Sequence, residues 1–174
     1  RVGSGNTTLN LYGQDVLRNL PRISFDENTG SVLRMNVSAD NSFSTFEFNS
    51  KGVIELAIAE GASLKIEKLT TKNGVKSISN AEIVFYDYNA DAFLLEDSTL
   101  TAEDDKLYIP SVDSYIKLTA HDEAGNLLVG DWVYDWSEEL GVGKLVLNAV
   151  PEPEAAAVLL GVLALALAAR RKKN

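Results

Sequence analysis

Apolar residues recur at every second position in short segments along most of the chain. In residues 33–37 and 54–58, leucine, isoleucine, methionine and valine alternate with other residues, most of them polar. Successive side chains of a β-strand point to opposite faces, so this alternation is typical of strands with one buried face. We identify no long helical pattern before Glu154. The pattern therefore predicts an all-β domain over residues 1–149.

Turn residues separate the expected strands at intervals of about ten residues, as at Asn73-Gly74 and Gly125-Asn126. Short strands at this spacing fit either a β-sandwich or a parallel β-solenoid. Residues 52–66 resemble the rungs of autotransporter-like β-repeat surface proteins, in which apolar positions stack and small residues turn the corners. No fixed repeat continues past residue 75. We expect a solenoid-like N-terminal part that passes into antiparallel strands, with a β-sandwich as the alternative.

Residues 150–174 differ in composition from the rest of the chain. They contain a proline motif, an uninterrupted small and apolar run, and a basic end: Val150, Pro151, Glu152 and Pro153; residues 155–169; and Arg170, Arg171, Lys172 and Lys173. Proline disfavours a helix before the run, whereas alanine and leucine favour one within it. Cations that follow an apolar helix favour the cytoplasmic side of a membrane. We expect a single C-terminal transmembrane helix over 155–169, a basic tail over 170–174, and an extracytoplasmic domain before them.

This order of proline motif, apolar run and basic end resembles the PEP-CTERM sorting signal of Gram-negative bacteria. The resemblance implies export, an inner-membrane precursor, and processing by exosortase, an integral membrane cysteine transpeptidase. It assigns recognition to the motif Val150 to Pro153 and membrane topology to the four cations Arg170 to Lys173. It further implies a final location at the cell surface or in the extracellular matrix, with extracellular polysaccharide as a second partner.

The apolar run is shorter than a standard membrane span. Its 15 residues would form about 22 Å of helix, whereas the hydrocarbon core is about 30 Å thick. Arginine and lysine side chains at its end can snorkel to reduce this gap. A short, weak anchor is consistent with a sorting signal that is removed after export.

Charge and composition exclude some classes of binding partner and of metal site. The formal net charge is −9, and four of the 16 basic residues follow Ala169, so the residues before Ala155 carry 12 basic and 25 acidic side chains. This excess of acidic side chains repels nucleic acid, and no nucleic-acid partner is expected. The absence of cysteine excludes disulfides and thiolate metal sites. The chain begins at Arg1 without an export signal, so we expect it to be the C-terminal part of a longer protein.

Three aromatic residues alternate along one expected strand: Trp132, Tyr134 and Trp136. Side chains at this spacing share one face, whereas Asp131 and Asp135 share the other. Three rings on one face are a candidate sugar-binding platform. Burial of the same face against the core is the alternative, and we expect it because burying aromatic rings is favourable and burying carboxylates is costly.

Asp87, Asn89 and Asp91 have the spacing of the first ligands of a calcium loop. Ala92 stands where an EF-hand requires glycine, and Ser98 stands where it requires a bidentate glutamate. We therefore expect a turn closed by asparagine and aspartate side chains, with an irregular calcium site as the weaker alternative.

Catalytic residues are not evident in the sequence. His121 is the single histidine, no Gly-x-Ser-x-Gly motif accompanies it, and it precedes a turn at residues 122–126. Neighbouring carboxylates such as Asp104 and Asp105 would point to opposite faces of a strand. The sequence is interpreted as an exported surface or matrix protein without catalytic activity or cofactor. The alternative is a carbohydrate-binding module or a carrier segment of an upstream secreted enzyme.

Overall fold

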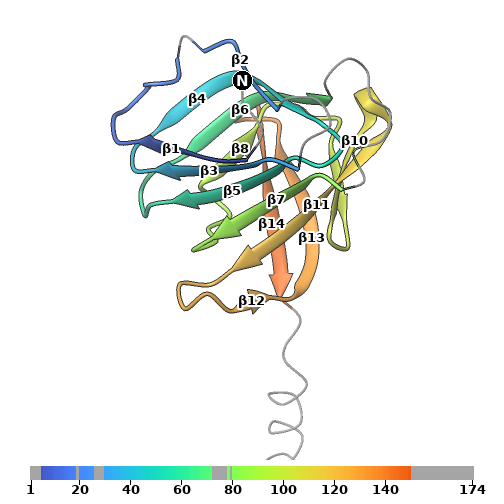
Figure 1. Cartoon of the computed structure of the whole chain (residues 1–174). Coiled ribbons are helices and arrows are strands. Elements are labelled where there is room, and N and C mark those ends of the chain that lie inside the picture. Colours follow the sequence, from blue (N-terminus) through green and yellow to red (C-terminus); the bar gives the residue numbers. More distant parts are fainter. Residues whose placement is uncertain (1–4, 19, 26–29, 72–77, 79, 150–174) are drawn as a thin grey trace, which may run out of the picture.

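The protein is a two-sheet β structure in a computed structural model that describes residues 5–18, 20–25, 30–71, 78 and 80–149 (Figure 1). Eight strands form one sheet and six form the other. The first sheet contains β1 (Asn6–Leu11), β3 (Val32–Val37), β5 (Val53–Ile58), β7 (Glu82–Tyr86), β9 (Thr101–Glu103), β10 (Lys106–Ile109), β11 (Ser114–His121) and β12 (Leu127–Leu128). The second contains β2 (Arg22–Ser24), β4 (Asn41–Phe48), β6 (Leu64–Thr71), β8 (Phe93–Leu95), β13 (Gly130–Ser137) and β14 (Val142–Ala149). A short 3-10 helix, η2 (Pro110–Val112), separates β10 from β11.

The N-terminal part is a parallel solenoid. Each coil places one strand in each sheet, so that β1, β3, β5, β7 and β11 pair in parallel on one side. On the other side β2, β4, β6 and β8 pair in parallel. Two parallel neighbours need a connection that brings the chain back to the end at which the first strand began. Here a strand of the opposite sheet forms part of that connection. The prediction of an all-β, solenoid-like fold is confirmed.

The C-terminal part changes to antiparallel pairing. Strand β11 pairs antiparallel with β10 and β12, and β9 continues the sheet from β10. In the second sheet β14 pairs antiparallel with both β8 and β13. The expected passage from solenoid coils into antiparallel strands is thus observed, and it lies at one end of the stack (Figure 1).

Apolar side chains from successive coils stack in rows between the sheets. One row contains Leu33, Ile54, Ile83 and Leu118, which are neighbours in register across four parallel strands. Each of these side chains is at most 2% exposed. The alternation visible in the sequence therefore marks the inward face of each strand, and the stacked rows form the core.

Phenylalanine rings fill the opposite side of the core in the first coils. Phe46 lies 5.6 Å from Phe25 and 4.9 Å from Phe48, measured between ring centroids. All three side chains are fully buried. Tilted aromatic pairs at these distances are attractive beyond the area that they bury.

The coils differ in length although their strands remain in register. Val32 pairs with Val53, which is 21 residues further along the chain, and Val53 pairs with Glu82, 29 residues further. Glu82 then pairs with Lys117 after another 35 residues. The extra residues lie in the connections between strands, which explains why a fixed repeat is not visible beyond residue 75.

Gly52 allows the ring of Phe25 to approach the backbone at the start of β5. A Cβ atom at position 52 would lie 2.5 Å from Cδ2 of Phe25. We predict that Gly52→Ala lowers the free energy of unfolding by about 1–3 kcal/mol, because the buried ring must shift. Urea unfolding followed by tryptophan fluorescence measures the change.

Gly30→Ala is the matched control for this substitution. A Cβ at position 30 would meet no atom within 4 Å, and its φ angle is not in the left-handed region. We expect the stability of this variant to stay within about 0.5 kcal/mol of the parent protein. Equal losses in the two variants would contradict the role assigned to the contact between Gly52 and Phe25.

Candidate functional site

The predicted sorting segment lies outside the described residues. This applies to the motif Val150, Pro151, Glu152 and Pro153, to the apolar run 155–169 and to Arg170, Arg171, Lys172 and Lys173. Within the part of the chain that the structure does describe, no helix has the length and apolar character required for a membrane crossing. The transmembrane helix and the sorting motif therefore remain predictions.

The last described strand ends directly before the proline motif. Strand β14 ends at Ala149, and Ala149 pairs with Gly130 of β13. The β-sheet and the predicted signal are therefore adjacent in sequence, without a linker between them.

The aromatic face of β13 turns toward the core. Trp132 is 3% exposed, and its ring lies 5.6 Å from Phe85 and 5.2 Å from Tyr88. Tyr134 and Trp136 share this face but are only partly buried. Asp131 and Asp135 are exposed on the opposite face, as expected. The expected burial is thus complete for Trp132 and partial for Trp136.

Tyr134 is fixed by contacts on β14 and β8. Its ring covers Gly143, where a Cβ would lie 2.2 Å from the ring. Its hydroxyl oxygen lies 2.8 Å from the carbonyl oxygen of Asp97 and 3.2 Å from that of Leu95, both acceptors. Burial raises the pKa of Tyr134 well above its ordinary value, and the charge of Asp97 adds to this shift. With Trp132 enclosed and Tyr134 fixed in this way, the three rings do not form an open flat platform.

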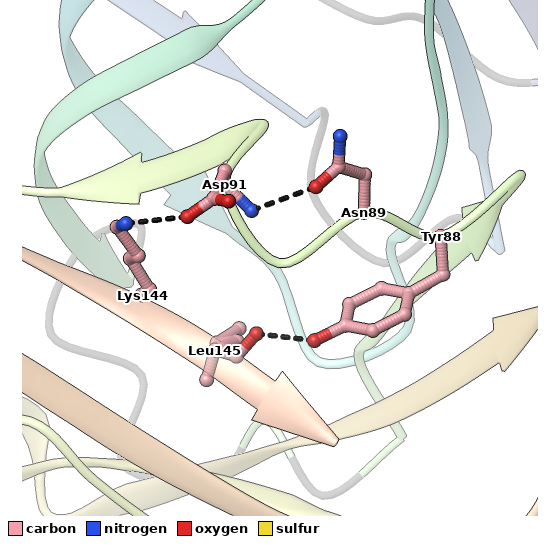
Figure 2. A network of polar contacts seen from close by, with 5 residues as sticks. All are labelled: Tyr88, Asn89, Asp91, Lys144 and Leu145. Carbon is pink, nitrogen blue, oxygen red and sulfur yellow. Dashed lines mark hydrogen bonds and ion pairs between the residues drawn. The ribbon is translucent and has the colours of Figure 1, made fainter. Parts of the chain in front are cut away.

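The loop that contains Asp87, Asn89 and Asp91 is closed by its own side chains (Figure 2). The Asn89 side-chain oxygen accepts a hydrogen bond of 3.0 Å from the backbone N–H of Asp91. The carboxylate of Asp91 forms an ion pair with Lys144 of β14. Asp87 itself adopts a left-handed backbone conformation with a φ of 52°. The arrangement is that of a turn closed by an asparagine side chain. The Asp91 carboxylate, which a bound calcium ion would need as a ligand, is already paired with Lys144.

No group of three or more histidine or acidic residues in the described ranges is arranged to hold a metal ion. The weak calcium candidate at Asp87, Asn89 and Asp91 therefore gains no further carboxylate ligand from the fold. The interaction of Asp91 with Lys144 instead joins this loop to the terminal hairpin.

Tyr88 makes a second connection between the same loop and β14. Its hydroxyl donates a hydrogen bond of 2.5 Å to the carbonyl of Leu145 (Figure 2). The same hydroxyl accepts a hydrogen bond of 3.0 Å from the N–H of Leu147. Burial raises the pKa of this tyrosine. The role of Tyr88 is not visible in the sequence, because its partners lie 57 and 59 residues away along the chain.

A hollow of about 790 Å³ lies beside this loop, where β5, β7 and β11 end. Its acidic lining residues are Glu60, Asp87, Asp122 and Glu123. Hydrogen bonds from the side chain and backbone of Asn126 hold the pKa of Asp122 below its ordinary value. The acidic lining makes the hollow unfavourable for anions.

His121 is the last residue of β11 and directly precedes the turn at residues 122–126. Its ring stacks on Tyr86 at 5.2 Å, and its Nδ1 lies 3.2 Å from the carbonyl oxygen of Gly125. The guanidinium of Arg34 lies 5.6 Å from the other ring of this pair, that of Tyr86. His121, Tyr86 and Arg34 therefore stack on one another. None of the described contacts of His121 is with a nucleophilic side chain.

Comparison with known proteins gives no relative: no protein-family model, no curated protein and no solved structure matches the chain.

Tyr88→Phe tests the connection between the solenoid and the terminal hairpin. We predict a loss of about 1–3 kcal/mol in the free energy of unfolding, because two backbone groups of β14 lose their hydrogen bonds to the hydroxyl. Tyr108→Phe is the matched control, since its hydroxyl donates to the exposed Asp113. The control should change stability by less than about 0.5 kcal/mol. Equal effects would contradict the special role of Tyr88.

Tryptophan fluorescence tests whether Trp132 is available to a sugar. Trp136→Phe leaves Trp132 as the only tryptophan, since the chain has two. We expect blue-shifted emission that acrylamide quenches slowly and that added polysaccharide does not change, with the urea-unfolded variant as reference. Red-shifted, rapidly quenched emission that polysaccharide protects would instead support a sugar-binding platform.

Proposed function

We propose that this chain is an exported, non-enzymatic surface or matrix protein whose C-terminal PEP-CTERM-like signal is processed by exosortase. The order of proline motif, apolar run and basic end in residues 150–174 is the observation that carries the proposal. In this proposal residues 155–169 hold the precursor in the inner membrane, and residues 170–173 keep its end in the cytoplasm.

The position of the last described strand supports this division. The β14 ladder continues through Ala149, and Pro151 follows two residues later. Proline has no backbone N–H and cannot donate to a sheet, so Pro151 and Pro153 disfavour an extension of the β14 ladder. A processing enzyme needs an accessible extended backbone, and the proline motif meets this need better than any position within β14.

The proposed absence of catalysis rests on the surroundings of the titratable groups. His121 contacts Tyr86 and a backbone carbonyl, and Asp91 pairs with Lys144. These partners stabilise structure and do not activate a nucleophile. A stacked β-domain with an acidic surface fits a structural component of the cell surface or of a polysaccharide matrix.

The proposal predicts that residues 148–174 are sufficient for sorting. Fused to a passive exported reporter, they should retain the precursor in the membrane fraction. A shorter reporter should appear only in cells that contain exosortase, because the enzyme cuts near the motif. Cell fractionation and immunoblotting with matched strains that contain or lack exosortase measure both effects.

Two variants separate recognition from membrane retention. Pro151→Ala combined with Pro153→Ala should keep the reporter in the membrane but prevent its shortening. Replacement of Arg170 to Lys173 by serine should weaken retention or invert topology. A fusion that stays soluble and uncut in every strain would refute the proposal.

A further inference from the structure

Two exposed apolar side chains lie in the connection between β11 and β13. Leu127 of β12 is 57% exposed, and Val129, which directly follows β12, is 66% exposed. Leu128 between them packs against the core. Successive side chains of an extended segment point to opposite sides, so Leu127 and Val129 share the outward side. Single exposed apolar residues are common on proteins, and the importance of this pair comes from its position in the fold.

The pair lies at the end of the molecule where β14 ends. Val129 directly precedes Gly130, and Gly130 pairs with Ala149, the last residue of β14. Facing residues of an antiparallel pair have Cα atoms about 5 Å apart. In Figure 1 the arrow of β14 ends at the same end of the molecule as β12. The two exposed side chains are therefore neighbours of the point at which the chain leaves the second sheet.

The exposure of this pair does not depend on the N-terminal coil. Strands β3, β5, β7 and β11 separate β1 from β12 in the first sheet. Neighbouring strands lie about 4.8 Å apart, so five such steps place β1 about 24 Å from β12. A further coil stacked on β1 would extend the sheet in the direction away from β12.

The distance to the apolar run is short. This inference rests on the proposed function, in which residues 155–169 lie in the inner membrane. Residue 155 follows Ala149 by six positions, and six extended residues span at most about 22 Å. The polar interfacial layer on each side of a bilayer is itself about 5–8 Å thick. The run therefore acts as a tether that keeps Leu127 and Val129 at a high effective concentration near the lipid surface.

Charge at this end selects the kind of lipid. Glu123 lies in the turn between β11 and β12, Asp131 follows Gly130, and both are exposed. Residues 118–143 contain no lysine and no arginine. Anionic headgroups would repel this surface, whereas zwitterionic headgroups would not.

We propose that Leu127 and Val129 seat the domain on a zwitterionic lipid surface while the C-terminal run holds the precursor in the membrane. The two side chains enter the interfacial layer, which removes their apolar area from water. This contact keeps the residues that follow Ala149 beside the bilayer, where an integral membrane enzyme acts.

A fluorescent label at a single cysteine tests this contact, because the native chain has no cysteine. Val129→Cys in the full chain is labelled with nitrobenzoxadiazole maleimide and reconstituted from detergent into phosphatidylcholine vesicles. Leu140→Cys is the matched control, since Leu140 is 65% exposed. It lies in the turn between β13 and β14, at the opposite end of the eight-residue hairpin from Ala149. The two ends are about 25 Å apart.

The label at position 129 should emit at shorter wavelength and about twice as brightly as the label at position 140, because it leaves water for the interfacial layer. Lipids with a spin-labelled headgroup should quench the label at 129 strongly and the label at 140 little. Replacement of part of the phosphatidylcholine by phosphatidylglycerol at low salt should reduce the difference between the two positions, because the acidic end is repelled.

A reporter beside the pair tests the two apolar side chains themselves. Ala124→Cys places the label in the exposed turn between β11 and β12. Leu127→Ser combined with Val129→Ser should lower its vesicle-dependent emission about twofold, because the apolar contact is lost. Leu140→Ser should leave that emission unchanged. Circular dichroism of all variants checks that the β fold is retained.

Flotation of the vesicles separates this proposal from the proposed function. A chain that does not float with the vesicles overturns both the membrane anchor and the lipid contact. A chain that floats while the labels at 129 and 140 behave alike overturns the lipid contact alone. Bright emission at 129 that spin-labelled lipid does not quench would place a part of the chain itself over the pair, and this result also overturns the proposal.

Discussion

Parallel stacking of coils in register is the constraint on which the rest of this structure depends. Each inward side chain must lie on the equivalent side chain of the preceding coil, as Met35, Leu56 and Phe85 do across β3, β5 and β7. Such a coil cannot bury its apolar face alone, so stability comes from contact with its neighbours. The corners of the coils are free to vary, which is why connections of very different length leave the rows intact.

The stack of parallel coils is followed by a differently built C-terminal part. At the C-terminal end, antiparallel strands extend both sheets, and Tyr88 and Trp132 close the core against the last parallel coil. Among the described strands, β1 pairs with β3 alone.

The inward face of each strand could be predicted from the sequence because alternation is a local signal, as at residues 33–37 and 54–58. The same alternation predicted that Asp131 and Asp135 of β13 are exposed. The stacking of His121 on Tyr86 and the two hydrogen bonds of Tyr88 could not be predicted. They depend on which strands become neighbours, and that is set by loops whose lengths follow no repeat. The partial exposure of Trp136 has the same origin, because β13 is the outer strand of its sheet.

The position of the last strand restricts how the proposed processing can occur. Four extended residues span at most about 14 Å, so residues 150–153 would place an enzyme close to the folded domain unless β14 opens at its end. Beyond Lys144, β14 pairs with β13 alone, which makes its last residues the easiest to release. Tyr88 holds the N–H of Leu147, so release without loss of that hydrogen bond is confined to Asn148 and Ala149. Under the proposed function, Tyr88 therefore limits how far from the folded domain the enzyme can bind the chain.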